Sequence, residues 1–164
     1  MKNGVYDIYL MNLNGTAIFC GCTGSEYCQQ HVGQHELHTG FFSAIYGFSR
    51  EAFQEGELQG VTLGKVQLNF KIDSPNQIML ALVHPGEVKL KVVRRQMEQV
   101  MRLYISKFQN RVQPHVVDEQ LQAEFMDQIR ALGITTATTI HPVGKMQMSS
   151  DKLVEKVTGI LQQE

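Results

Sequence analysis

The run Ile-Met-Leu-Ala-Leu-Val at residues 78–83 is the feature that most limits how this chain folds. A short, almost continuously apolar run suits a strand buried at the centre of a sheet. Pro85 and Gly86 end the run, since proline and glycine interrupt regular structure. The sequence therefore predicts a sheet with residues 77–84 in its interior.

Two strand-like segments stand at the start of the chain, at residues 5–11 and 16–20. Asn14-Gly15 lies between them and supplies the positive φ angles that a tight hairpin turn requires. We therefore expect these two segments to pair antiparallel.

Two more strand-like segments precede the apolar run, at residues 58–63 and 65–72, with Gly64 as the turn between them. In the second segment, apolar and polar residues alternate, so one of its faces is predicted to contact water. The polar residues of this segment are Lys65, Gln67, Asn69 and Lys71.

Three segments have the three- and four-residue spacing of apolar residues that marks an amphipathic helix: residues 40–55, 87–109 and 117–132. Thr39 and Gly56 are the expected cap and stop of the first helix. Its apolar residues are expected to lie on one face and to be mostly core. These residues are Phe41, Phe42, Ile45, Phe48, Ala52 and Phe53.

The predicted order of elements is ββαβββαα, and the predicted class is α+β. We expect a five-stranded antiparallel sheet that buries one face against the helices at 40–55 and 87–109, forming an α/β sandwich. Residues 1–133 are predicted to form one domain, with a polar Cys- and His-bearing insert at 20–39. Residues 134–164 are predicted to be a linker or arm that ends in a short helix.

Composition excludes several classes of protein. The 15 basic and 16 acidic residues give a net charge of −1, which offers no global attraction for nucleic acid. The sequence has neither a secretory signal pattern nor an apolar run long enough to span a bilayer. Three cysteines, an odd number, fit a reducing compartment. We therefore expect a cytoplasmic protein.

Three segments resemble the longin and roadblock group of profilin-like, SNARE-like folds: residues 6–19 (YDIYLMNLNGTAIF), 41–49 (FFSAIYGFS) and 63–70 (LGKVQLNF). Roadblock domains usually place a helix before the first strand, so its absence here favours a longin-like domain. The resemblance implies a non-enzymatic module of vesicle trafficking or small-GTPase regulation. Such domains bind partners through sheet edges and the groove beside the first helix.

The resemblance also implies where a partner binds. The expected partner is a small GTPase or a SNARE-type helix, through which the protein would reach membranes. The alternative is a roadblock-like dimeric scaffold or GTPase-activating platform, which would form a homodimer. The residues predicted to contact a partner are Phe42, Tyr46, Leu58, Val61 and Leu63.

The strongest candidate for chemistry is the insert, which contains all three cysteines and half of the six histidines. Thiolate and imidazole are good zinc ligands, so zinc is a candidate cofactor, and a thiol-dependent protein is a further alternative. However, Cys-x-Cys is not the usual ligand spacing, and Cys20 and Cys22 would share one face of the second strand as small core residues. The candidate metal ligands are Cys20, Cys22, Cys28, His31, His35 and His38.

No catalytic motif is recognised: the phosphate-binding glycine patterns, H-E-x-x-H and G-x-S-x-G are absent from the sequence. A small basic cluster, Lys89, Lys91, Arg94 and Arg95, begins the long helix. It indicates either a solvated helix face, which the near-neutral composition favours, or attraction to an anionic lipid or an acidic partner.

Overall fold

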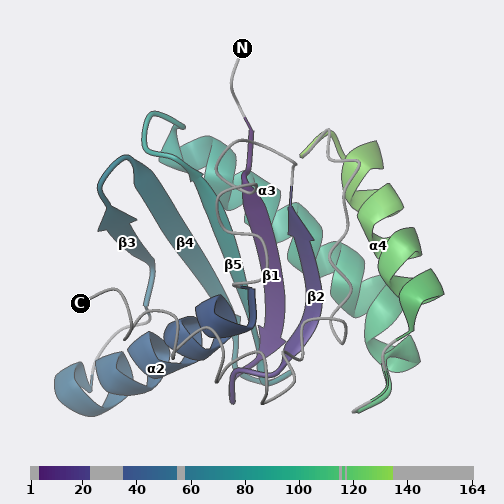
Figure 1. Cartoon of the computed structure of the whole chain (residues 1–164), viewed down its shortest axis with the longest axis horizontal. Coiled ribbons are helices and arrows are strands. Elements are labelled where there is room, and N and C mark those ends of the chain that lie inside the picture. The colour runs from purple at the N-terminus through teal and green to yellow at the C-terminus, as the bar shows by residue number, and fades with distance from the viewer. Residues whose placement is uncertain (1–3, 23–34, 55–57, 115, 117, 135–164) are drawn as a thin grey trace, which may run out of the picture.

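The computed structural model describes residues 4–22, 35–54, 58–114, 116 and 118–134 (Figure 1). The strands are β1 (Asp7–Asn12), β2 (Ala17–Cys22), β3 (Gly60–Leu63), β4 (Val66–Asp73) and β5 (Ile78–Pro85). The helices are α2 (His35–Phe53), α3 (Leu90–Leu103) and α4 (Glu119–Ala131), and α3 continues into a π-helical turn (Tyr104–Phe108) and a 3₁₀ turn (Gln109–Arg111).

The five strands form one antiparallel sheet in the order β2-β1-β5-β4-β3. The predicted α+β class and five-stranded sheet are confirmed. β5 lies at the centre, as its apolar run predicts, and all eight of its residues are buried. The domain boundary at residue 133 stays a prediction, because residues 135–164 lie outside the described part of the chain.

Helices cover both faces of the sheet, and this corrects the expectation that the helices at 40–55 and 87–109 share one face. On β5, Leu80 and Leu82 pack with α3 and α4, whereas Met79 and Ala81 pack with α2. Successive side chains of a strand point to opposite faces. A strand that is apolar at every position therefore requires a covering layer on each side.

The long helix predicted at 87–109 begins at Leu90 and changes to a π-helical turn at Tyr104. The apolar residues of α3 lie against the sheet, and Val93 and Val100 are fully buried. π-helical segments occur mostly as single turns within α-helices. Here the turn leaves both Tyr104 and Phe108 buried.

α4 covers the outer edge of β2 (Figure 1). Ile18 has no register partner in β1, because the pairing of β1 with β2 shifts by one residue there. Its carbonyl accepts a hydrogen bond from the Gln122 side chain at 2.6 Å. The ring of Phe125 stacks on Phe19, with centroids 4.2 Å apart, and meets Phe108 edge-on. A covered edge does not pair with strands of other molecules. Within the described residues, β3 is the edge of the sheet without such a cover.

Replacing Phe125 with alanine should lower the free energy of unfolding by about 3–5 kcal/mol, because a fully buried ring is lost and a cavity remains. The matched control is Phe53→Ala, whose exposed ring should change it by less than about 0.5 kcal/mol. Urea unfolding monitored by circular dichroism measures both values. Equal effects of the two substitutions would contradict the docking of α4.

Candidate interaction surfaces

α2 crosses one face of the sheet from β1 toward β4 (Figure 1). The ring of Phe42 contacts Tyr9 of β1 and Phe70 of β4 edge-on, with centroids 5.2 and 5.5 Å apart. Phe42 and Tyr46 are both buried, at positions four residues apart on one side of the helix. These two residues therefore attach α2 to the sheet.

Other large apolar residues of α2 are exposed. The exposed fractions are 71% for Leu37, 44% for Phe41, 66% for Phe48 and 69% for Phe53, and we call these four residues the α2 aromatic face. The rings of Phe48 and Phe53 contact each other edge-on, with centroids 6.3 Å apart. A group of exposed aromatic residues on one helix is typical of an interaction site.

The prediction that the apolar residues of this helix are mostly core was wrong. At about 100° per residue, Phe41 and Phe48 lie about 100–120° around the helix from Phe42, outside the strip that meets the sheet. Phe53 lies within about 20° of Phe42 but is the last residue of the helix, where it is exposed. The helix also begins at His35, before the predicted cap Thr39, which lies buried inside it. The spacing of Phe42 and Tyr46 was the sequence signal for the buried strip.

The five residues predicted to contact a partner are placed differently from one another. Phe42 and Tyr46 are buried, Leu58 and Val61 are half-buried against the same core, and Leu63 on the edge strand is 51% exposed. Their contact with a partner stays a prediction. The exposed rings of Phe41, Phe48 and Phe53 are the surface residues that sequence reasoning missed.

The candidate metal ligands are only partly described. Cys20 and Cys22 lie in β2 and are buried, as the alternative of small core residues predicts. Cys28 and His31 lie outside the described residues, as does the side chain of His35. Among the side chains that the structure does place, no three His, Cys, Asp or Glu residues are grouped as metal ligands. Zinc stays a prediction.

His38 lies in α2, which begins before the helix predicted at 40–55. Its Nδ1 is 2.8 Å from the hydroxyl of Tyr9, and that hydroxyl donates to Oδ2 of Asp7 at 3.3 Å. This chain of polar groups attaches the first turns of α2 to β1.

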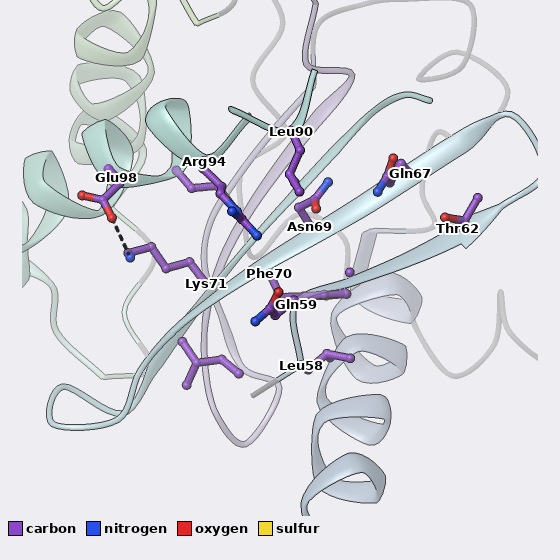
Figure 2. A pocket seen from close by; sticks show the side chains of 13 residues that line it. Leu58, Gln59, Thr62, Gln67, Asn69, Phe70, Lys71, Leu90, Arg94 and Glu98 are labelled. Carbon is purple, nitrogen blue, oxygen red and sulfur yellow. Dashed lines mark hydrogen bonds and ion pairs between the residues drawn. The ribbon is translucent and has the colours of Figure 1, made fainter. Parts of the chain in front are cut away.

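A second surface lies on the other face of the sheet, where α3 leaves β4 and β3 uncovered. A groove of about 400 Å³ runs between α3 and these strands (Figure 2). We call it the β4–α3 groove; it is lined in part by Thr62, Gln67, Lys71, Leu90, Arg94 and Glu98. The Nζ of Lys71 forms an ion pair with Glu98 at 3.1 Å.

His84 is buried beside this groove. Its Nδ1 donates to the carbonyl of Pro85 at 2.8 Å, and its Nε2 accepts from the amide of Asn69, a residue that lines the groove. Burial lowers the pKa of His84 below its ordinary value, and the hydrogen bond to Pro85 only partly offsets this effect. The neutral ring is therefore the form that the fold accommodates.

No family model and no curated protein sequence matches the chain. Among solved structures, the chain is similar to Myxococcus xanthus MglB, with a TM-score of 0.47 and 15% identity over 62% of this chain and 85% of that protein. It is also similar to a roadblock/LC7 domain from Streptomyces avermitilis, with a TM-score of 0.44 and 13% identity over 62% and 83% of the two chains.

A third similar structure is that of the mammalian SRP receptor, with a TM-score of 0.44 and 15% identity over 79% of this chain and 95% of the other. These likenesses concern the fold alone and identify no partner. In the described part of the chain, no helix is long and apolar enough to cross a membrane.

Acidification should destabilise the protein through His84. Because the folded-state pKa is below 6.5, the unfolded chain takes up a proton first as the pH falls. This contribution to stability is complete above about pH 6.5 and is lost below it, with a slope of at most about 1.4 kcal/mol per pH unit. Urea unfolding of the wild type and His84→Gln between pH 5 and 8 measures the difference.

The difference in the free energy of unfolding between the wild type and His84→Gln cancels the contributions of the other five histidines. The wild type should lose more stability than the variant between pH 7 and 5. If the free energy of unfolding changed with pH by the same amount in both proteins, a neutral buried His84 would be contradicted.

Proposed function

We propose that this chain is a non-enzymatic protein-interaction module that binds a small GTPase through the α2 aromatic face. The observation that carries the proposal is the exposure of Phe41, Phe48 and Phe53 on a helix that Phe42 and Tyr46 fix to the sheet. The longin-like resemblance of the sequence favours a GTPase or a SNARE-type helix as the partner. It also favours a role in trafficking on the cytoplasmic side of membranes.

The physical basis of binding is the burial of aromatic rings on a rigid helix. Exposed rings gain about 25 cal/mol for each Å² of apolar surface that a partner removes from water. Arg50 lies on the same helix, with its guanidinium 5.6 Å from the centre of the Tyr46 ring. Aromatic residues and arginine dominate the energetics of protein interfaces, so this part of α2 has the composition of a binding centre.

Replacing both Phe48 and Phe53 with alanine should weaken binding to the GTPase at least about tenfold, because two exposed anchor rings are lost. Isothermal titration calorimetry against a panel of small GTPases, each loaded with GDP or a non-hydrolysable GTP analogue, measures the affinity. Stability should stay close to that of the wild type, since both rings are exposed.

Leu132→Ala is the control, because Leu132 is an exposed apolar residue at the end of α4, away from α2. This variant should bind like the wild type. If no GTPase in the panel binds, the choice of partner is wrong. If a GTPase binds and the double variant binds it equally well, the assignment of the surface is wrong.

A homodimeric scaffold is the second candidate, and the open edge of β3 favours it. In the described part of the chain, no strand pairs with the outer side of β3, and an unpaired edge is a template for pairing with a second copy. The proposed dimer would join two sheets along β3.

Leu63→Lys should convert such a dimer to a monomer, because lysine on an exposed edge strand opposes pairing between copies. Leu63 is exposed, so the fold should tolerate the charge. Native mass spectrometry of protein purified without chelator reports the assembly and any bound zinc in one spectrum. A wild type that is monomeric at every accessible concentration would exclude this candidate.

A further inference from the structure

The β4–α3 groove is a recessed polar surface on the side of the sheet opposite to the α2 aromatic face. α3 packs over β5 and β1 through its apolar residues, and β4 extends beyond that cover. Figure 2 shows Arg94 and Glu98 of α3 beside Lys71 of β4, with Gln67 further along the same strand. A polar part of a sheet with a helical wall beside it is suited to hold a ligand rather than to join the core.

Arg94 is the dominant charge of this groove. Its side chain lines the groove, and no ion pair of Arg94 is recorded within the described residues. Lys71, by contrast, is already paired with Glu98. Lys91 and Arg95, the neighbours of Arg94 in the basic cluster, are exposed on the same helix but do not line the groove. A guanidinium in a partly enclosed site prefers a carboxylate or a phosphate as its partner.

The floor of the groove matches an extended chain. Gln67, Asn69 and Lys71 alternate along β4 with residues that point to the other face, so they recur at the two-residue period of a strand. Gln67 offers both an amide donor and an acceptor, and Leu90 on α3 adds an apolar contact. An extended peptide that presents alternate side chains to this floor has the same period.

We propose that the β4–α3 groove binds an extended, acidic peptide segment of a partner protein, with a carboxylate on the guanidinium of Arg94. Residues 135–164 contain three lysines and three acidic residues, so the tail of this chain offers no net negative charge for the site. A flat lipid surface does not reach the floor of a recessed groove, which favours a peptide over a membrane.

This proposal does not rest on the proposed GTPase binding, because the two surfaces lie on opposite faces of the sheet. The α2 variants leave the groove intact, and variants of Arg94 leave the α2 aromatic face intact. The failure of one proposal is therefore distinguishable from the failure of the other.

The test is a titration of the ¹⁵N-labelled full chain with an acetylated peptide of four Glu-Val repeats, followed by amide chemical shifts. We expect shifts confined to β3, β4 and α3. Arg94→Glu should weaken binding at least about tenfold, and the matched control Arg95→Glu no more than about twofold. Both substitutions are at exposed positions of one helix and make the same change in charge, and urea unfolding checks that both variants fold.

Three further probes distinguish the sources of negative charge: four Lys-Val repeats, inorganic phosphate, and phosphatidylcholine vesicles containing phosphatidylserine. Binding of the Glu-Val peptide that is lost in Arg94→Glu and retained in Arg95→Glu supports the proposal. The proposal is overturned by absence of peptide binding, by equal loss in both variants, by equal binding of the Lys-Val peptide, or by a response to phosphate or vesicles alone.

Discussion

The burial of β5 on both faces is the constraint on which the rest of the structure depends. Every residue of this strand is buried, and its backbone pairs with β1 on one side and β4 on the other. Because its side chains point alternately to the two faces, the sheet needs apolar cover above and below. α2 supplies one layer, and α3 with α4 supplies the other. The positions of both candidate surfaces follow from where these layers end.

The helices on the two faces of the sheet cover different parts of it, and the two candidate surfaces arise from this difference. α2 rests on the sheet through a narrow strip that includes Phe42 and Tyr46, and the other phenylalanines of the helix are exposed. α3 covers the centre of the other face and leaves the polar side of β4 beside its own charged residues. One surface is therefore aromatic and convex, and the other is a polar groove. Surfaces of such different chemistry select different partners.

Polar groups within the fold are paired in ways that fix its parts. The carbonyl of Ile18 accepts a hydrogen bond from the side chain of Gln122. This contact joins α4 to the edge of β2. His84 in its neutral form links Asn69 to Pro85, so the floor of the groove rests on a histidine whose pKa is lowered by burial. His38, Tyr9 and Asp7 connect the start of α2 to β1. A buried polar group without a partner is costly, so these contacts also contribute to the stability of the fold.

The sequence by itself determined the order of the elements, the central place of β5 and the polar side of β4, because strand and helix periods are local properties of the chain. It also gave most strand boundaries to within one or two residues. Only the tertiary structure decided that α2 and α3 lie on opposite faces, that Phe41, Phe48 and Phe53 are exposed, and that Arg94 stands over β4. The apolar spacing of a helix shows that it has a buried side, but the width of that side depends on what it packs against. For α2, the sheet beneath it set that width.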